Sequence, residues 1–446
     1  MMTFTKDFKF GVATSAYQVE GATTEDGKTP SIWDTFCRTP GKVYEGQTGD
    51  IACDHYHRYK EDVRLMKEMG VNSYRFSIAW SRIFPAYGTY NPTGMAFYKN
   101  LIHELQENGI EPVVTLYHWD LPMWAYERGG WLNRESVEWF KEYATRVFEE
   151  LNDSVKLWIT HNEPFCASIL GYDTGIHAPG HRNMREALTA AHHILLSHGA
   201  AVEAFRECGF SDSKIGVTLN LTPAVPASNA KEDVEAASRS DGLANRWFLD
   251  PVFRSSYPED MKKVLGKVVG DFDFVKDGDL QRISTKIDFL GVNYYTRSTI
   301  KFIQDGLLNE EEVPGDPRNA TAMGWQICPQ ALEDLLLRLR RDYTHIPIYI
   351  TENGAAFDDV LTNDKHVHDT QRIDYIKGHL RKIAEANEQE ADIRGYYLWS
   401  LLDNFEWAAG YSKRFGIVHV DFPTQERSLK DSALWYRDTI GSRTIE

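Results

Sequence analysis

Two glutamates stand out by their surroundings. Glu163 and Glu352 each follow a short apolar run, and each is accompanied by an asparagine and by a proline or glycine. An arbitrary glutamate is a solvated surface residue, because Glu is almost never fully buried unless it is paired. Hydrolysis of a glycosidic bond uses two carboxyl groups, one as acid and one as base or nucleophile. If the fold brings these two glutamates together, they could cleave a sugar linkage.

Other polar and aromatic side chains occupy comparable positions, at or just after apolar runs. They are Gln18, Arg75, His118, Asn162, Asn220, Asn293, Tyr295, Trp399, Glu406 and Trp407. Pyranose rings present C–H faces that pack on tryptophan, and hydroxyls that need closely spaced donors and acceptors. This mixture of carboxylates, amides and aromatic planes suits a carbohydrate site better than a metal or phosphate site.

Several of these residues also fit a purely structural role. His118 fits a hydrogen-bonded core histidine, and Trp399 fits ordinary core packing, because most tryptophans are largely buried. Arg75 lies within an apolar run, where an arginine indicates a buried ion pair. Both roles are compatible for Arg75, since its partner could be a catalytic carboxylate.

The elements that must position these residues follow a repeating order of strand and helix. Strands are predicted at residues 10–14, 72–78, 111–117, 155–160, 214–219, 287–292, 347–350 and 395–398. Amphipathic helices are predicted at residues 57–69, 97–105, 137–151, 186–208, 332–339 and 373–383, from apolar spacings of three and four. Continuous apolar strands separated by helices imply a parallel sheet covered by helices.

Eight such strands favour an α/β fold of the (β/α)₈ TIM barrel type over an open doubly wound sheet. An open sheet of that kind usually carries a Gly-rich nucleotide turn after its first strand, which is missing here. Residues 221–286 and 313–324 are predicted to be long loops, and residues 1–446 a single domain whose long βα loops form the site. In such a barrel the chemistry gathers at the carboxyl ends of the strands. Glu163 and Glu352, on strands four and seven, would therefore face each other across the mouth.

Composition excludes several classes of partner. The 446 residues carry 49 Lys plus Arg against 65 Asp plus Glu, a net charge of −16. Nucleic acid and anionic membranes both require clustered basic residues, so neither is expected as a partner. No run approaches the roughly 20 apolar residues of a membrane span, and charged residues interrupt any signal-peptide core near the N-terminus. Five scattered cysteines fit free thiols in a reducing compartment, so a cytoplasmic location is expected.

Other chemistries have weaker support. The pairs His55/His57 and His192/His193 lack the accompanying spacing of a zinc motif, and adjacent histidines on a helix point in different directions. No G-x-S-x-G elbow indicates a serine hydrolase, and no P-loop is present. We therefore expect no metal and no cofactor.

Four segments carry a family resemblance. Residues 8–21 (FKFGVATSAYQVEG) resemble the N-terminal signature of glycoside hydrolase family 1, and residues 160–164 (THNEP) resemble its T-x-N-E-P acid/base motif. Residues 350–354 (ITENG) resemble its nucleophile motif, and residues 399–407 (WSLLDNFEW) its strand-eight sugar-binding segment. The four matches occur in order and span nearly the whole chain, so their combination is highly specific.

The resemblance implies a retaining β-glycosidase that works by double displacement. Glu352 would attack the anomeric carbon while Glu163 protonates the leaving oxygen and later deprotonates water. Arg75 and Tyr295 would keep Glu352 ionised and oriented, and the carboxyl groups should lie ~5–5.5 Å apart. Asn162 would bind the sugar 2-hydroxyl. The remaining hydroxyls would be held by Gln18, His118, Asn293, Tyr295, Glu406 and Trp407, with Trp399 as the stacking surface.

The chain departs from the family pattern at His161, where members commonly carry an apolar residue. Successive side chains of an extended segment point to opposite sides, so His161 should point away from Asn162 and affect the pH profile at most. Members that cleave 6-phosphoglycosides share a Ser, a Lys and a Tyr that bind the phosphate in the strand-eight segment. This chain has Glu406 and Trp407 at the first of these positions. A carboxylate facing a phosphate is repulsive. In the family's thioglucosidases Gln replaces the acid/base Glu, so Glu163 argues against that class.

The favoured function is that of a β-glucosidase acting on terminal β-D-glucosyl residues of short oligosaccharides such as cellobiose and of aryl glycosides, with tolerance for β-galactosides. Trp325 and Asn220 are the predicted aglycone contacts. Three alternatives stay open: a 6-phospho-β-glycosidase, a non-catalytic sugar-binding barrel, and an enzyme whose main output is transglycosylation. The second tends to lose one catalytic carboxylate, and both are present here.

Overall fold

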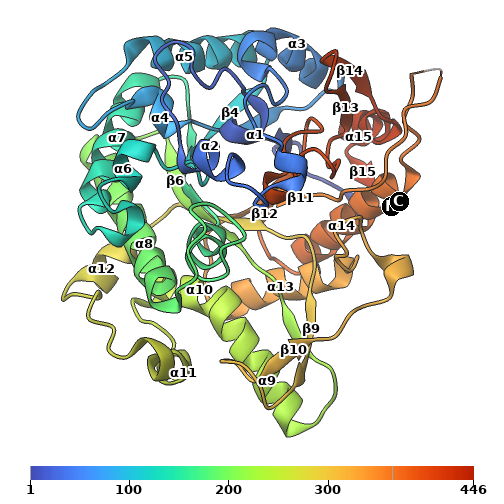
Figure 1. Cartoon of the computed structure of the whole chain (residues 1–446). Helices are drawn as coiled ribbons and strands as arrows, with labels where there is room; N and C mark the ends of the chain where they lie inside the picture. The colour runs from blue at the N-terminus through green and yellow to red at the C-terminus, as the bar shows by residue number, and fades with distance from the viewer. Residues whose placement is uncertain (1, 364, 446) are drawn as a thin grey trace.

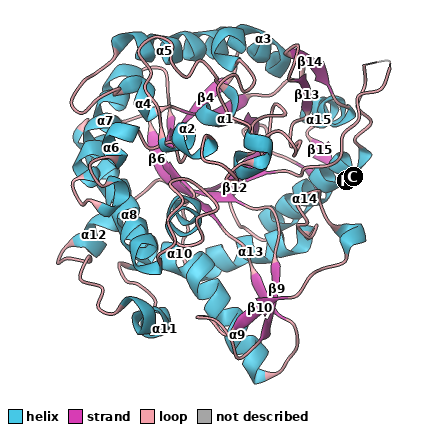
Figure 2. Cartoon of the chain, viewed as in Figure 1, coloured by secondary structure: helices cyan, strands magenta, loops and turns pink. Residues whose placement is uncertain are grey.

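Eight parallel strands close into a barrel at the centre of the computed structural model, which describes residues 2–363 and 365–445 (Figures 1 and 2). In chain order the barrel strands are β2 (Lys9–Ala13), β3 (Ser73–Ser77), β4 (Glu111–Tyr117), β5 (Leu157–Asn162), β6 (Lys214–Asn220), β8 (Phe289–Asn293), β11 (Ile348–Asn353) and β12 (Ile393–Trp399). Each strand pairs with the next, and β12 pairs with β2 to close the ring. The predicted (β/α)₈ barrel and its eight strands are confirmed.

Long helices surround the barrel, as Figure 1 shows. Those that follow the predicted pattern are α3 (His55–Glu68), α5 (Pro92–Glu107), α7 (Ser136–Leu151), α8 (Met184–Glu207), α13 (Pro329–Asp342) and α14 (Thr370–Glu388), with α15 (Asp431–Ser442) after the last strand. Helix α7 illustrates why they form: Val137, Phe140, Ala144, Val147 and Leu151 share one buried face. The barrel strands do not alternate apolar and polar residues, because the side chains on both of their faces are buried.

The prediction that residues 221–286 form a loop is wrong. The segment contains strand β7 (Ala224–Pro226) and helices α9 (Lys231–Asp241), η4 (Gly242–Arg246), α10 (Trp247–Arg254), α11 (Glu259–Val269) and α12 (Asp279–Ile283). Helix α11 buries Met261, Leu265 and Val269 at a spacing of four. This periodicity is visible in the sequence, although Pro251 inside α10 looks like a helix breaker. The segment connects the neighbouring barrel strands β6 and β8, so the strand–helix alternation itself calls for helices here, and the loop prediction overlooked this.

A small sheet lies beside the barrel, next to α9 at the lower edge of Figure 1. Its strands run in the order β10 (Glu310–Glu312), β9 (Ser298–Phe302), β7. Residues 313–324, predicted as a loop, contain only the single turn η5 (Pro317–Asn319).

Short elements complete the chain. They are α1 (Ala16–Val19), α2 (Ile32–Cys37), η1 (Tyr44–Gly46), α4 (Trp80–Ile83), α6 (Met123–Tyr126), η2 (Gly130–Leu132), the π-helical turn η3 (Cys166–Leu170), η6 (Trp407–Ala409), and the hairpin β13 (Val418–Asp421) with β14 (Glu426–Leu429). Strands β1 (Met2–Thr3) and β15 (Thr444–Ile445) pair with each other, so the two ends of the chain lie side by side (Figure 1). Among the described helices, none combines the length and apolar character needed to cross a bilayer.

Candidate active site

A cavity of about 760 Å³ opens at the carboxyl ends of the barrel strands. Ten of the predicted site residues line it: His118, Glu163, Asn220, Asn293, Tyr295, Trp325, Glu352, Trp399, Glu406 and Trp407. The other three, Gln18, Arg75 and Asn162, are buried beneath its wall. The volume falls in the range of roughly 300–1,000 Å³ that holds organic ligands larger than a single ring. The cavity therefore has room for a sugar and its aglycone.

The strand ends that carry the two glutamates are locally irregular. The pairing of β5 with β6 shifts between Ile159 and Asn162, and the pairing of β11 with both neighbours shifts beyond Ile350. Such bulges re-aim side chains, and they are common next to active sites. Gly354 is required here, because a Cβ at this position would overlap the carbonyl oxygen of Trp399.

Glu352 is held through both carboxylate oxygens. The Arg75 guanidinium donates to Oε1 at 2.6 Å, and the Tyr295 hydroxyl donates to Oε2 at 2.6 Å. Arg75 is itself fixed by the Thr351 carbonyl, the Asn162 side chain and the Thr115 hydroxyl. A buried carboxylate with two charge-stabilising donors is oriented and kept ionised.

Glu163 has different surroundings. Its φ is +49°, in the left-handed region that non-glycine residues rarely adopt, and its backbone N–H donates to the Thr218 carbonyl at 2.9 Å. Asn293 Nδ2 donates to Glu163 Oε1 at 2.6 Å. No cation forms an ion pair with Glu163 among the described residues. Strained backbone of this kind concentrates at functional sites, where the surrounding structure over-determines the conformation.

The difference in surroundings separates the two carboxyl groups electrostatically. Burial, and then the negative charge of Glu352, raise the pKa of Glu163 to about 8, although the hydrogen bond from Asn293 lowers it. Burial also raises the pKa of Glu352, but Arg75 and Tyr295 oppose the shift. The first proton to leave the pair therefore comes from Glu352, so near neutral pH the pair holds one carboxylate and one carboxylic acid.

This arrangement predicts the alkaline limb of the pH profile. As pH rises through the pKa of Glu163, about 8, the acid loses its proton and kcat/KM for cellobiose should fall about tenfold per pH unit. The measurement is kcat/KM from pH 5 to 10. In Glu163→Ala, assayed on 2,4-dinitrophenyl β-D-glucoside, this limb should disappear because that leaving group needs no proton. A wild-type profile that stays flat to pH 10 would contradict the assignment.

A third carboxyl group, that of Glu406, also lines the cavity. Gln18 Nε2 donates to it at 3.3 Å and to Asn404 Oδ1 at 3.0 Å, while Gln18 Oε1 accepts from the Ser15 hydroxyl at 2.7 Å. Burial, and the charges of Glu352 and Glu163, raise the pKa of Glu406 to about 8. Gln18 therefore positions Glu406, and the structure does not place Gln18 in the cavity wall.

The three central amides and His118 form one network. Asn162 Oδ1 accepts from Arg75 and from Asn293, and Asn162 Nδ2 donates to His118 Nε2 at 3.0 Å. Asn293 Oδ1 accepts from Thr351, so the Oδ1 atom and both Nδ2 protons of Asn293 have partners in the protein. His118 Nδ1 has no partner in the described chain, and burial lowers the pKa of His118 well below its usual range. Neutral His118 thus presents an unpaired N–H.

Aromatic planes build the walls around this network. The His118 ring stacks near Trp399 and near Trp407, at centroid distances of 5.9 Å in both cases. Trp325 packs against Tyr295 at 5.3 Å and against Phe415 at 6.1 Å. An aromatic ring of a ligand or the C–H face of a pyranose can pack against these aromatic surfaces.

Sequence reasoning missed Trp119, Cys166, His177 and Phe415, all of which line the cavity. Cys166 could have been found, because it lies three residues after Glu163 at the start of a helical turn, where i and i+3 side chains are neighbours. Its thiol lowers the pKa of the Glu163 carboxyl. Trp119 follows His118 directly and donates through Nε1 to the Asn162 carbonyl at 2.9 Å. Phe415 has no comparable signal, because it comes from a loop between the last barrel strand and β13.

His161 points away from the cavity, as expected. It is buried, its Nε2 bonds the Ser197 hydroxyl at 2.9 Å, and its ring packs on Phe140 at 4.3 Å. Burial lowers the pKa of His161 well below its usual range, so the ring is neutral. The other prominent histidines also have partners: His55 bonds Asp62 at 2.7 Å, and His192 bonds Asp279 at 2.8 Å.

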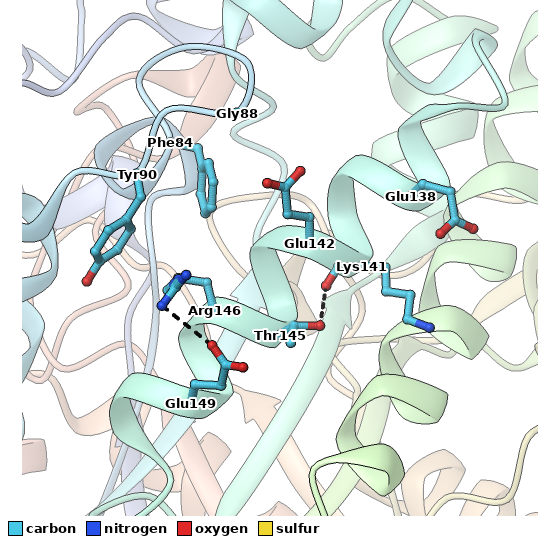
Figure 3. A pocket seen from close by; sticks show the side chains of 9 residues that line it. All are labelled: Phe84, Gly88, Tyr90, Glu138, Lys141, Glu142, Thr145, Arg146 and Glu149. Atoms are coloured by element: carbon cyan, nitrogen blue, oxygen red, sulfur yellow. Dashed lines mark hydrogen bonds and ion pairs between the residues drawn. The ribbon is translucent and has the colours of Figure 1, made fainter.

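A second hollow, of about 450 Å³, lies on the outer surface between helix α7 and the loop after α4 (Figure 3). Its charged side chains are largely paired with one another or with neighbours: Arg146 with Glu149 at 3.5 Å, and Lys141 with Glu207 at 3.3 Å. No strand end of the barrel contributes to its lining. Its lining shares no residue with that of the barrel cavity.

A (β/α)₈ barrel whose mouth holds an ion-paired carboxylate, a protonated carboxylic acid and a tryptophan-lined cavity is the architecture of a glycosidase. The chain matches the sequence profile of Glycosyl hydrolase family 1 over residues 1–444. It therefore belongs to this family and is a glycosyl hydrolase.

Known relatives resemble the chain over nearly its full length. It is 50% identical to Beta-glucosidase A of Acetivibrio thermocellus, covering 98% of each chain. It is 43% identical to the 1,4-beta-D-glucan glucohydrolase of Thermotoga neapolitana, covering 99% of this chain and 98% of the relative. The crystal structure of the GH1 beta-glucosidase from Exiguobacterium antarcticum B7 superposes with a TM-score of 0.97 at 55% identity, covering 99% of both chains.

Proposed function

We propose that the protein is a retaining β-glucosidase with Glu352 as nucleophile and Glu163 as acid and base. The observation that carries this proposal is the asymmetry of the two buried carboxyl groups: Arg75 and Tyr295 both bind Glu352, while Glu163 has no ion-pair partner in the described chain. The β-glucosidase names of the relatives support the same activity.

The reaction proceeds in two displacements. A Glu352 oxygen attacks the anomeric carbon, the glycosidic C–O bond breaks, and the proton of Glu163 passes to the leaving oxygen. Esterification removes the charge of Glu352, so the pKa of Glu163 falls and its carboxylate can accept a proton from water. That water attacks the anomeric carbon, releases the sugar with retained configuration and restores both carboxyl groups.

The remaining predicted contacts bind the sugar. His118 donates its unpaired Nδ1–H to a hydroxyl, Glu406 accepts from other hydroxyls, and Trp399 and Trp407 pack on the ring. Asn162 retains one Nδ2 proton for the 2-hydroxyl, where contacts strengthen most in the transition state. Asn293 and Gln18 act by positioning Glu163 and Glu406. Trp325 and Asn220 face the aglycone.

The glycone is an unphosphorylated sugar. The described lining of the cavity contains Glu163, Glu352, Glu406 and Glu312 and no lysine or arginine. The two nearby residues that could bind a phosphate already donate hydrogen bonds to the backbone. Lys413 donates to the Ala322 carbonyl at 2.7 Å, and Tyr411 donates to the Thr48 carbonyl at 2.7 Å. A phosphate dianion would face these acidic groups, of which Glu352 is ionised, and no lysine or arginine of the described lining would compensate its charge. Glucosides are therefore the favoured substrates, with β-galactosides tolerated.

The experiment is a comparison of kcat/KM on 4-nitrophenyl β-D-glucoside and on its 6-phosphate. We expect the unphosphorylated substrate to be preferred at least ~100-fold, the effect of placing one uncompensated charge in a partly desolvated site. The matched control is 4-nitrophenyl β-D-galactoside, which changes one hydroxyl without adding charge. Preference for the phosphate would show that the protein is a 6-phospho-β-glycosidase, and no turnover of any substrate would favour a sugar-binding barrel.

The physiological setting follows from the same features. All five cysteines are free thiols, which supports a reducing, cytoplasmic location. Cellobiose and related products of cellulose degradation are suitable substrates there, and product analysis at high substrate concentration separates hydrolysis from transglycosylation. We treat residues 1–446 as one glycosidase domain, because one continuous hydrophobic core joins the barrel and its helices.

A further inference from the structure

A loop between β12 and β13 carries two residues of the cavity lining. We call residues 404–413 the tip loop; Glu406 and Trp407 belong to it and line the cavity. Trp407 has a φ of +48° and Gly410 a φ of +56°, and the Glu406 N–H donates to the Gly410 carbonyl at 2.7 Å. The tip loop is therefore tightly folded, so a shift of its two ends would move Glu406 and Trp407 together.

An ion pair joins the two ends of the tip loop. Asp403 precedes the loop, Arg414 follows it, and the Arg414 guanidinium donates to Asp403 Oδ2 at 2.6 Å. The other carboxylate oxygen, Oδ1, accepts from the Gly416 N–H at 3.0 Å. A Cβ on Gly416 would lie 2.0 Å from the Asp403 nitrogen, so only glycine allows the two chain segments to approach this closely. The Asp403 carboxylate thus closes the loop through both of its oxygens.

The Asp403 carboxylate belongs to a largely buried cluster with equal numbers of acidic and basic side chains. The members of the cluster are Asp359, Asp369, Asp403, Arg372, Lys430 and Arg414. Lys430 is fully buried and donates to Asp403 Oδ1 at 2.7 Å, and Arg372 donates to the Arg414 carbonyl at 2.8 Å. Burial raises the pKa of the Asp403 carboxyl, but Lys430 and Arg414 hold it below its usual range. Asp403 is therefore ionised, and loss of Arg414 would leave one buried negative charge in excess.

The two catalytic carboxyl groups are held independently of the tip loop. Arg75 and Tyr295 bind Glu352, and Asn293 binds Glu163. All of these partners come from barrel strands or from the loop after β8. A loosened tip loop should therefore weaken sugar binding more than it slows the chemical step.

We propose that Arg414 is a positioning residue for sugar binding: its ion pair with Asp403 fixes the tip loop, and thereby the directions of the Glu406 carboxyl group and the Trp407 indole. Arg414 is not among the described residues that line the cavity, so it acts through the loop and not by touching the sugar. This inference rests on the proposed β-glucosidase function and deepens it, because it identifies what holds the sugar-binding groups in place.

The first test is a comparison of kcat and KM on 4-nitrophenyl β-D-glucoside for the wild type, Arg414→Met and Arg414→Lys. In Arg414→Met we expect KM to rise about tenfold, the effect of losing one charge-assisted hydrogen bond, and kcat to stay within about twofold. The loss is limited because Gln18 and Gln47 still bind the tip loop through Phe405 and Tyr411. Lysine keeps the charge, so Arg414→Lys should recover part of the KM.

The control variant is Arg282→Met, which removes an arginine of similar exposure. The Arg282 side chain is 26% exposed and that of Arg414 is 24% exposed, and Arg282 pairs with Glu203 and Glu138 outside the cavity lining. Its KM should equal that of the wild type. Because Arg414→Met leaves the Asp403 charge in excess, the double variant Asp403→Asn/Arg414→Met is made as well; it lacks that charge and should show the same rise in KM.

A double-mutant cycle with Glu406→Gln tests whether Arg414 acts through Glu406. Arg414→Met should lower kcat/KM about tenfold when Glu406 is present and less than about threefold in Glu406→Gln, because residues that act as one unit are not additive. A lower melting temperature with an unchanged KM, or an equal loss in both backgrounds, would show that the ion pair serves stability alone and would overturn the proposal. Failure of the wild type to cleave 4-nitrophenyl β-D-glucoside would instead overturn the proposed function, and the inference with it.

Discussion

Replacing Glu352 by glutamine is expected to abolish turnover on every β-glucoside, with a loss in kcat on the order of 10⁵-fold. Glutamine preserves the size of the side chain and can still contact Tyr295, but it cannot form the covalent ester. The loss should be equally severe for activated aryl glucosides, because a better leaving group cannot replace a missing nucleophile. The measurement is kcat on 2,4-dinitrophenyl β-D-glucoside and on cellobiose.

A matched control is Glu333→Gln, which alters another buried glutamate. Glu333 lies on α13, pairs with Lys382 at 3.0 Å and does not line the cavity. Its kcat should stay within a factor of two or so of the wild-type value, since a change remote from the site affects stability more than chemistry. Activity of Glu352→Gln near the wild-type level would eliminate Glu352 as the nucleophile.

Replacing Glu163 by alanine should affect substrates according to their leaving groups. For cellobiose, whose leaving alcohol must be protonated, kcat/KM should fall by ~10³-fold or more, within the usual contribution of general acid catalysis. For 2,4-dinitrophenyl β-D-glucoside the fall should be less than about tenfold, because that phenolate leaves without a proton. An equal loss on both substrates would count against Glu163 as the acid.

Azide provides an independent check on the same variant. In Glu163→Ala no base activates water, so the glycosyl-enzyme should accumulate, and azide, which needs no base, should enter the space of the missing carboxylate. Because the sugar is bound to Glu352 on its α face, azide must attack from the β face and yield β-glucosyl azide. Formation of the α anomer, or no acceleration by azide, would contradict the geometry proposed for the two glutamates.

The barrel was predictable because its strands are defined locally. A parallel strand buried on both faces reads as a continuous apolar run, and residues 111–117 coincide with β4. The end of β11 was not predictable from hydrophobicity, since the strand continues through the polar residues Thr351–Asn353 toward the cavity. Helices α9 to α12 lie between the neighbouring barrel strands β6 and β8, where the strand–helix alternation calls for helices. They were missed because the long segment was interpreted as a loop insertion.

The sequence predicted which residues form the candidate site, but it did not predict the hydrogen bonds between them. Strand ends meet at one face of a barrel, so Glu163, Glu352, His118 and Glu406 could be grouped without coordinates. The directions of the amides depend on several strands at once. Asn293 binds Glu163 and Asn162, and Gln18 binds Glu406 and Asn404. The spacing of residues along the chain does not predict which hydrogen-bond partners these amides have.

The central claim, that Glu352 forms the covalent intermediate, is tested most directly by trapping it. A 2-deoxy-2-fluoro-β-D-glucoside with a dinitrophenolate leaving group should react once and stop, because the fluorine slows hydrolysis of the ester more than the good leaving group slows its formation. Mass spectrometry of the intact protein and of its peptides should find one fluoroglucosyl group, attached to Glu352. A label on Glu163 or on any other residue, or release of phenolate without a label, would contradict the mechanism.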